Sequence, residues 1–453
     1  MKKFTVQFSD ERLITPSGLS LVGSLLEKSD LVKSCNEISS TSKRSQPQIK
    51  NGDMLLTYIG LLCQGKTQFE AVREMSEDPE FYKMALGITE GIPSPERLRQ
   101  RMDEIGSSLR TEILKANVTM FKNCGSKPSA LSNGYVPVDI DVTPFDNSKT
   151  AKEGVSRTYK GYDGYSPMMA YIGTEGYLVN CELREGKQHC QKDTPEFLIE
   201  TLELCHQLTD EPLLIRLDAG NDAAENLGIL IEDGSWFIIK RNLRKNESKQ
   251  EWLDNVKSCC KDIRTPRKGK TVYVGTSWKD VSYKDTEKNT KTMGIRIGYE
   301  IIERSIDKNG QFLFCSDIEA NTWWTNLGLT DNEIIELYHA HAESEQFHSE
   351  IKTDMDVERL PSGKFDTNEL VLELTILAYN SLRLIGRESL IIKSSPKPKH
   401  SVKRRRIRTV ISNLIQIAGH VKKHSRKVIL DLGCSNLWRY AFRDIYHRFV
   451  SVK

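Results

Sequence analysis

The chain has 453 residues, of which 38% are apolar, so it is too long for one simple core and predicts two to four domains. No apolar run reaches the ~18 residues of a membrane-spanning helix, the N-terminus lacks the apolar stretch of a secretory signal, and the ten cysteines form no CxxC pair, which together indicate a reduced cytoplasmic protein. The net charge of +3 is uneven, because residues 393–453 hold 16 Lys and Arg against two Asp and so carry +14, while the first 392 residues carry −11.

The N-terminal part is predicted to be helical after a polar start. Residues 1–50 are turn-rich and indicate a loop or linker, whereas apolar residues recur at helical spacing over 52–123. The segment GIPSPERLRQRM resembles the turn and second helix of a helix-turn-helix, with Arg97, Arg99 and Arg101 as phosphate contacts. An ordinary surface helix explains it equally well. We expect residues 1–130 to form a helical DNA-binding domain.

The texture changes to strands at residue 134. The segment YVPVDIDVT alternates, with apolar residues on one face and Asp139 and Asp141 on the other. Strands are predicted over 135–143, 168–174, 177–186, 213–220 and 235–242, and helices over 194–208 and 221–233. This β-β-β-α-β-α-β order predicts an α/β fold with an RNase H-like mixed sheet.

The second half of the chain divides into three predicted regions. Charged loops and short β runs predict a β-rich insertion over 241–322 that interrupts the RNase H-like core of 131–240. Helical texture returns over 323–392, which we expect to complete the core with the catalytic helix. Residues 393–453 are expected to form a basic helical region that binds DNA through Arg404, Arg405 and Arg406, because neutralising phosphates releases counterions. A solvated tail is the alternative.

Three acidic residues far apart in the sequence suit metal-dependent phosphodiester chemistry. Asp141 and Asp218 end strand-like runs, and Glu345 lies in a helix-like run. Carboxylates from strand ends and a facing helix can hold one or two Mg²⁺ ions, one activating water or a 3′-hydroxyl and the other stabilising the leaving oxygen. We therefore predict these residues as catalytic metal ligands, with Mn²⁺ as a substitute for Mg²⁺.

The predicted catalytic helix carries four functional side chains on one stripe. Tyr338, His341, Glu345 and Lys352 follow each other at spacings of three, four and seven residues, which return to one face of a helix. The stripe offers a phenol, an imidazole, a carboxylate and an ammonium to one groove, so we expect the other three side chains to contact DNA near Glu345.

Neighbouring residues leave alternatives open. Asp139 shares a strand face with Asp141, and Asp222 lies close to Asp218, so each is an alternative ligand. Glu343 is turned about 160° from the stripe and is expected to be solvated. The histidines around Glu345 suggest zinc, but they form no H-x3-H pair, which disfavours it.

Two further groups are candidate DNA contacts. Lys149, Arg157 and Lys160 are interleaved with tyrosines after the first Asp, a pattern that suits phosphate tracking and base stacking, or else an ordinary exposed loop. Trp323 and Trp324 precede the catalytic helix and can stack on a flipped base, although a core role for at least one is the stronger reading.

These motifs together resemble bacterial insertion-sequence transposases of the DDE class, in the branch with a Y-R-E-K helix signature and a β-insertion. The matching segments are DIDVTPFDNSKTAKEGVSRTYKGYDGYSPMMAYIG, LLIRLDAGND, TNLGLTDNEIIELYHAHAESEQFHSEIK, RLPSGKF and LAYN, in the expected order over about 135–385. The resemblance assigns the Asp-x-Thr motif to Asp141, the second Asp to Asp218 and the Glu to Glu345.

The resemblance implies Mg²⁺-dependent cutting at terminal inverted repeats of double-stranded DNA and joining to target DNA. It also implies a homodimer that cuts in trans, a DNA hairpin intermediate and a place at the bacterial nucleoid, with no membrane partner. His341 stands where the signature has Arg, so we expect weaker phosphate binding that rises at lower pH, or else an inactive copy. The rival functions are an RNase H-like nuclease or resolvase without strand transfer, and a catalytically silent, transposase-derived DNA-binding protein.

Overall fold

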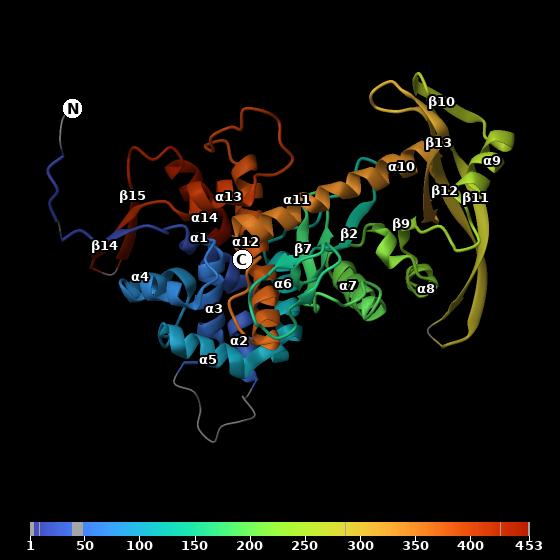
Figure 1. Cartoon of the computed structure of the whole chain (residues 1–453). Helices are drawn as coiled ribbons and strands as arrows, with labels where there is room; N and C mark the ends of the chain where they lie inside the picture. The colour runs from blue at the N-terminus through green and yellow to red at the C-terminus, as the bar shows by residue number, and fades with distance from the viewer. Residues whose placement is uncertain (1–3, 9, 39–48, 286, 426, 452–453) are drawn as a thin grey trace.

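The computed structural model of the chain describes residues 4–8, 10–38, 49–285, 287–425 and 427–451 (Figure 1). Its centre is a nine-stranded mixed sheet in the order β10-β11-β12-β13-β9-β8-β2-β6-β7. Five of these strands form the core: β2 (Val136–Val142), β6 (Met168–Ile172), β7 (Tyr177–Glu182), β8 (Leu213–Leu217) and β9 (Trp236–Arg241). Strands β2, β8 and β9 are parallel, while β6 is antiparallel to β2 and β7 is antiparallel to β6.

This arrangement confirms the predicted RNase H-like fold. Helices α7 (Thr194–Leu208) and α8 (Ala224–Asp233) connect the parallel strands, which gives the predicted β-β-β-α-β-α-β order. The strands form because their apolar residues alternate or run together, and β6 and β8 are buried along their whole length.

The β-rich insertion extends this sheet beyond β9. Its members are α9 (Lys249–Cys259), β10 (Asp262–Arg267), β11 (Lys270–Lys284), β12 (Thr290–Ile306) and β13 (Phe312–Thr325). The end of β13 pairs with β9, and Figure 1 shows the long hairpins standing out to one side of the molecule. Strand β13 therefore returns the chain to the core just before the predicted catalytic helix.

That predicted helix is one continuous but irregular run. It consists of α10 (Asp331–His339), the 3₁₀ turn η5 (Ala340–Ala342), α11 (Glu343–Ser349) and the π-helical turn η6 (Glu350–Asp354). Thr330 and Glu333 form a capping box that fixes its start. Figure 1 shows the run crossing over the core strands from the insertion towards α12 (Phe365–Ile391).

Helix α12 is buried on nearly every face and packs against β7 and the N-terminal helices. Those helices are α1 (Leu19–Leu26), α2 (Leu31–Glu37), α3 (Asn51–Leu62), α4 (Pro79–Leu86), α5 (Pro95–Ile105) and α6 (Arg110–Asn123), with 3₁₀ turns at η1 (Glu27–Ser29), η2 (Phe69–Ser76) and η3 (Gly106–Leu109). One hydrophobic core runs from Ile14 to Phe449. The start of the chain is thus more helical than the loop predicted for residues 1–50, of which 39–48 lie outside the described residues.

The C-terminal region differs from the helical prediction. Helices α13 (Ile407–Val410) and α14 (Arg439–Ser451) and the π-helical turn η7 (Ile411–Ile415) flank a hairpin of β14 (Gly419–His424) and β15 (Lys427–Leu432). Strand β14 also pairs with β1 (Leu13–Ile14). Residues about 400 positions apart thus share one small sheet, a contact that local sequence patterns do not predict.

Three short strands and one turn complete the described elements. Strands β3 (Phe145–Asp146), β4 (Ser156–Arg157) and β5 (Asp163–Tyr165) form a separate small sheet after β2, and the 3₁₀ turn η4 (Ala219–Asn221) follows β8. Among the described residues, no helix combines the length and the apolar character that a membrane crossing requires.

The predicted helix-turn-helix contact at Arg101 is wrong. Ser94 caps α5 as its sequence suggests, since its hydroxyl accepts a hydrogen bond from the Arg97 backbone N–H. The Arg101 guanidinium, however, is buried and donates to Glu104 at 2.6 Å and to Asn51 at 2.7 Å. A guanidinium that is committed to the protein core is unavailable to phosphate.

A buried carboxyl group in α12 makes folding depend on pH. Glu373 is 1% exposed, and its Oε1 lies 3.4 Å from the Arg110 guanidinium, which also binds Glu200. Burial raises the pKa of Glu373 to about 8. The positive charge of Arg110 opposes this shift, and the negative charge of Glu369 adds to it. The folded state therefore holds this proton more tightly than the unfolded state.

Glu373→Gln is expected to remove this pH dependence. Because the pKa of Glu373 is raised on folding, the wild-type protein has its full stability below the unfolded pKa and loses it as the pH rises towards 8. The variant should match the wild type near pH 5 and exceed its free energy of unfolding by roughly 1–3 kcal/mol at pH 9. Urea denaturation at both pH values measures the difference, and equal pH slopes for the two proteins would contradict the assignment.

Candidate active site

Asp141 and Asp218 end two neighbouring parallel strands. In the register of β2 and β8, Ile140 stands beside Leu217, so the next pair along the strands is Asp141 and Asp218. Adjacent strands lie ~4.8 Å apart, and residues in register point to the same face of the sheet. The fold therefore brings these two predicted carboxylates to one edge.

The two carboxylates influence each other. Burial and the negative charge of Asp141 raise the pKa of Asp218, although Asn221 and the Gly220 backbone N–H both donate to its Oδ1. Burial also acts on Asp141, but the histidines beside it outweigh burial and hold its pKa below the ordinary value. Two acidic groups that repel each other at a strand edge form a site that a cation would stabilise.

Asp139 has a different role from Asp141, although both lie on one face of β2. The Arg216 guanidinium binds it in a bidentate pair, with Nε 2.6 Å from Oδ1 and Nη2 2.7 Å from Oδ2. His341 Nδ1 lies 2.8 Å from the same Oδ1. All three side chains are buried. Asp139 thus serves as the anion of a buried charge cluster, and its oxygens are not free for a metal.

His341 is therefore placed differently from the expected phosphate contact. It is 7% exposed, and its Nδ1 faces Asp139, which raises the pKa of the imidazole above its ordinary value although burial opposes this. Any contact with phosphate would have to use Nε2. The charge of His341 acts to lower the pKa of both Asp141 and Asp218, so the ring lies near both carboxylates at this strand edge.

His348 is a neighbour of the site whose role the sequence did not reveal. Its Nε2 is buried without a hydrogen-bond partner and lies 3.4 Å from Asp141 Oδ2, while its Nδ1 is 3.0 Å from the Tyr171 hydroxyl. It follows His341 by seven residues, so the helical repeat was the available signal. His348 is the one imidazole that faces the candidate ligand Asp141 directly.

Glu345 lies on the helix between the two histidines. It follows His341 by four residues and precedes His348 by three, the spacings of surface neighbours on a helix, and it is exposed. Within the part of the chain that the structure describes, no group of three or more His, Cys, Asp and Glu side chains is close enough to hold a metal ion. The role of Glu345 as third ligand stays a prediction.

The carboxylates present fit a hard divalent cation. Asp141 and Asp218 offer oxygen atoms only, and their mutual repulsion is the electrostatic condition that a cation relieves. Mg²⁺ is commonly held by one or two carboxylates together with substrate phosphates and water. The buried alternative Asp222 does not compete, because Arg244, Trp324 and the Asn242 backbone N–H bind its oxygens.

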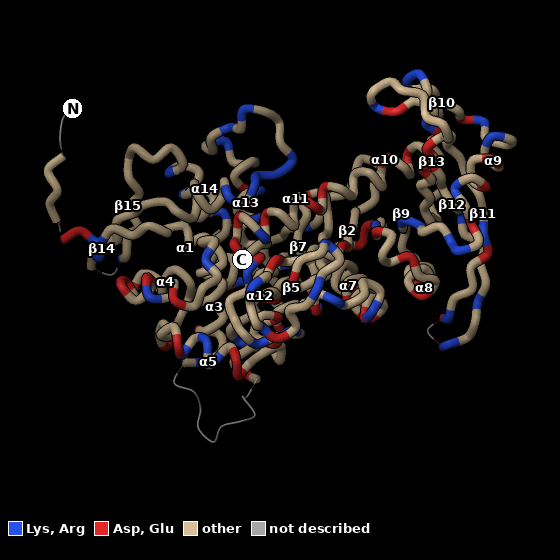
Figure 2. Tube along the Cα trace, in the orientation of Figure 1, with Lys and Arg blue, Asp and Glu red and all other residues tan. Residues whose placement is uncertain are grey.

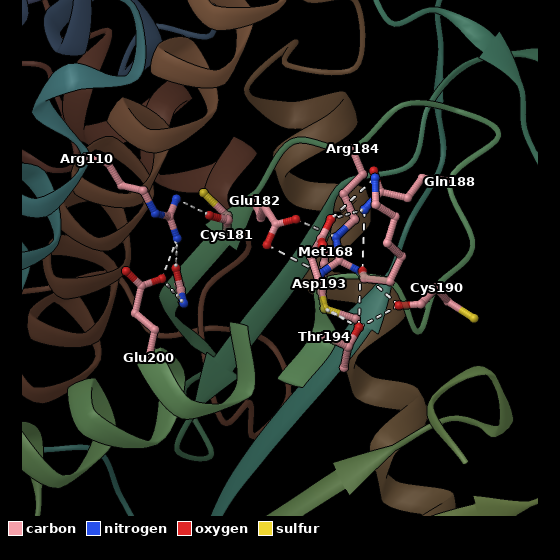
Figure 3. Close-up of polar contacts among 12 residues, drawn as sticks. Arg110, Met168, Cys181, Glu182, Arg184, Gln188, Cys190, Asp193, Thr194 and Glu200 are labelled. Carbon is pink, nitrogen blue, oxygen red and sulfur yellow. Dashed lines mark hydrogen bonds and ion pairs between the residues drawn. The ribbon is translucent and has the colours of Figure 1, made fainter. Parts of the chain in front are cut away.

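Hydrogen bonds hold the segment that supports the Asp218 turn (Figure 3). The Arg184 guanidinium binds Glu182 at 2.8 Å and donates to the Cys190 carbonyl at 2.9 Å, and the Thr194 hydroxyl donates to that carbonyl at 2.5 Å. The Cys190 thiol in turn lies 3.0 Å from the Gly220 carbonyl, within η4. The chain between β7 and α7 is thereby fixed against the turn that carries Asp218.

Two other members of the helical stripe also lie by the candidate site. Burial and the charges of Asp218 and Asp141 raise the pKa of Tyr338, whose ring packs on Trp323 and His341. The Lys352 ammonium donates to the Pro144 carbonyl at 2.6 Å and pairs with Glu358 at 3.1 Å. Lys352 therefore stabilises the loop after Asp141, and a contact between Lys352 and DNA stays a prediction.

The basic loop after Asp141 is accessible. Lys149, Arg157 and Lys160 are exposed, and the Lys160 ammonium lies 5.9 Å from the centre of the exposed Tyr159 ring. The Tyr159 hydroxyl donates to the Val142 carbonyl at 3.4 Å, which brings the ring to the end of β2. A contact of Lys149, Arg157 and Lys160 with DNA stays a prediction.

Trp323 and Trp324 are core residues in the structure. They are 1% and 2% exposed, and the Trp324 indole donates to Asp222. Both belong to β13, where it pairs with β9. Buried indoles offer no surface to a base, so the proposed base stacking is wrong for this conformation of the chain.

The run Arg404–Arg406 is also largely committed to the protein. Arg404 binds Glu343 and Gln346 and lies over the Phe347 ring at 4.4 Å, and Arg405 is buried over Trp438 at 4.8 Å. Arg406 pairs with Asp354 at 2.7 Å but remains partly exposed. The expected DNA contacts at Arg404 and Arg405 are therefore wrong here, because Arg404 is bound to the helix of Glu345 and Arg405 is bound to the end of α12 and the loop that follows it. Glu343 is an ion-pair partner rather than a solvated residue.

His348→Phe is expected to weaken the site without unfolding the protein. Phenylalanine keeps an aromatic ring beside Tyr171 but removes the Nε2 that faces Asp141. Loss of a group that orients a metal ligand typically lowers metal affinity or activity by roughly 10–100-fold, and we expect that loss in metal-dependent DNA cleavage. Tyr171→Phe is the control, since it removes only the partner of Nδ1. Equal activity of His348→Phe and the wild type would contradict the assignment.

Comparisons with known proteins add a family to this geometry. The family model described as "Transposase DDE domain group 1" matches residues 1–453. Among solved structures, the chain is similar to one in the cryo-EM structure of the piggyBac transposase synaptic complex with hairpin DNA, with 11% sequence identity and a TM-score of 0.40 over 97% of this chain and 85% of that chain. No curated protein matches the chain.

Proposed function

Because this chain belongs to the transposase family of DDE domain group 1, we propose that it cuts and joins DNA with Asp141, Asp218 and Glu345 as its catalytic carboxylates. The substrate would be double-stranded DNA with terminal inverted repeats, cut at the repeats and joined to target DNA. Family membership does not identify the catalytic residues, the metal ion or the reaction, so we propose these three.

One observation carries the residue assignment. Asp141 and Asp218 are side by side at the ends of β2 and β8, and the charge of one raises the pKa of the other. The rival carboxylates Asp139 and Asp222 are bound by arginines. Among the described residues, no arginine binds the two aspartates at the predicted strand ends, which distinguishes them from Asp139 and Asp222.

Asp141 and Asp218 would hold Mg²⁺, with Glu345 from the crossing helix. The bound ion would activate the attacking oxygen and stabilise the leaving oxygen of the phosphodiester. The protein fixes the carboxylates through β2, β8 and the turn after Asp218, and His348 orients Asp141. The charge cluster of Asp139, Arg216 and His341 carries a net positive charge when the imidazole is protonated, which favours a phosphate nearby.

The remaining predicted residues would guide the DNA. Lys149, Arg157 and Lys160 are exposed on the segment that follows β2, so they suit contacts with the sugar-phosphate backbone. Tyr338 and Lys352 would contact the DNA end after a small rearrangement of their present partners. Figure 2 shows a dense run of Lys and Arg on the loop between α12 and α13, where residues such as Lys397 and Lys399 are exposed to DNA.

The finer classification follows the sequence resemblance. We propose a bacterial insertion-sequence transposase of the Y-R-E-K branch that acts at the nucleoid as a homodimer and passes through a DNA hairpin. The domain limits from the sequence remain part of this proposal, with the insertion at 241–322 between the two parts of the core.

An assay of both reaction steps tests the proposal. The full chain is incubated with DNA that carries the flanking inverted repeats, together with supercoiled target plasmid and Mg²⁺, and the label is at the 5′ end of the strand whose new 3′ end is to be joined. We expect nicked or hairpin ends first and label joined to the plasmid later. Cleavage without joined product would indicate a nuclease or resolvase, and binding without cleavage would indicate a silent DNA-binding protein.

A further inference from the structure

An apolar groove lies between the N-terminal helices and the C-terminal region. It is bounded by α1, α2, α4, α14 and the β14–β15 hairpin, and it has a volume of about 1060 Å³. Its apolar lining includes Met84, Val421, Val428, Leu430 and Val450. Met84, Val428 and Val450 are 51%, 48% and 56% exposed, which is a large apolar surface to leave in water.

The N-terminal segment 4–8 carries a matching set of uncovered apolar side chains. Phe4, Val6 and Phe8 are 98%, 83% and 98% exposed. They alternate with Thr5 and Gln7, so in an extended strand all three lie on one face. We call residues 4–8 the arm. Its sequence has the pattern of a half-buried strand, but the arm of a single chain buries none of it.

The register of β1 directs the chain before it along the β14–β15 hairpin. Leu13 pairs with His420 and Ile14 with Gly419 in antiparallel order, and the Arg12 carbonyl accepts from the Val421 N–H. Followed backwards, the chain therefore runs towards the tip of the hairpin. Figure 1 shows the arm leaving the body beyond β14.

The base of the arm is anchored at the edge of the small sheet. The Arg12 guanidinium pairs with Asp78 and with Glu80 at 3.0 Å. Only three residues separate this anchor from Phe8, which is a short connection for a complete reversal into the same groove. The arm is thus held in a position from which it reaches outwards.

We propose that the arm of each chain occupies the apolar groove of a second copy, in a reciprocal exchange. Phe4, Val6 and Phe8 would cover the hairpin residues of the partner, and a two-fold axis makes both contacts equivalent. Charge favours the same match, since Asp10 and Glu11 at the base of the arm are exposed and acidic, while Arg439 and Arg443 line the groove. This contact does not depend on the catalytic proposal.

Sedimentation of the full chain without DNA tests the exchange. We expect a concentration-dependent dimer for the wild type and a dissociation constant raised at least 100-fold by F4D/V6D/F8D. T5D/Q7D is the matched control, because it adds charge to the other face of the arm and should leave the dimer intact. V428D, in the groove, should act like the triple variant. A wild type that stays monomeric, or a dimer indifferent to F4D/V6D/F8D, would overturn the proposal.

A crosslink then identifies which chain supplies the arm. Protein with V6C is mixed with differently tagged protein carrying V428C and oxidised, with each single variant alone as control for the native cysteines. A mixed-tag disulfide dimer is expected. A disulfide that forms only inside a V6C/V428C double variant, and never between chains, would show that the arm folds back on itself and would contradict the exchange.

Discussion

Asp218→Ala is expected to abolish DNA cleavage, with a loss on the order of 10³-fold or more, because it removes one of the three proposed catalytic carboxylates. Asp141→Ala and Glu345→Ala should give losses of the same size. The expected effect on stability is small for Asp218, since its pKa is raised by burial and by Asp141, so its ionised form is disfavoured in the folded protein. The substitution should therefore leave the free energy of unfolding unchanged or slightly higher.

The matched control for these variants is Glu336→Ala. Glu336 is exposed on α10, nine residues before Glu345, which turns it to the opposite face of the helical run. It removes the same charge from the same run and should keep full activity. If Glu336→Ala and Glu345→Ala lost activity equally, the effect would reflect net charge and not a catalytic carboxylate.

Asp139→Ala is expected to destabilise the protein by roughly 3–5 kcal/mol, because it leaves Arg216 and His341 buried without their anion. Arg216 and His341 together hold the pKa of Asp139 below its ordinary value even though burial opposes them. Its contribution is therefore present above the unfolded pKa and is lost as the pH falls through the folded pKa. Urea denaturation at pH 7 measures the loss of stability directly.

Substitution by asparagine distinguishes the roles of the two aspartates of β2. We expect Asp139→Asn to lower stability more than Asp141→Asn, and Asp141→Asn to lower cleavage more than Asp139→Asn at a temperature where both are folded. A stable Asp139→Asn protein that has lost cleavage would mean that Asp139 is the metal ligand and that Asp141 is misassigned.

The core strands could be predicted because the pattern of apolar residues along each strand indicates which side chains are buried. Alternation placed Asp139 and Asp141 on one face of β2, and the run of apolar residues before Asp218 marked a buried strand. Alternation is the same for both aspartates of β2, however, so it could not separate them. The difference comes from Arg216, which stands opposite Asp139 in the neighbouring strand.

Residues whose role depends on distant partners were the ones mispredicted. Arg404 and Arg405 have the composition of a DNA-binding tail, but their partners are Glu343 and Ser389 and the rings of Phe347 and Trp438. Pairs of this kind join residues that are 16 to 61 positions apart, and composition does not indicate such contacts. The pairing of β1 with β14 was missed for the same reason.

We propose that Asp141, Asp218 and Glu345 act through one divalent-cation site. Cleavage of inverted-repeat DNA by the wild type and by Glu345→Ala, each with Mg²⁺ and with Ca²⁺, tests this site once both proteins have been shown to bind that DNA equally. We expect cleavage by the wild type with Mg²⁺ alone and none by the variant with either ion. Undiminished Mg²⁺-dependent cleavage by Glu345→Ala would contradict it.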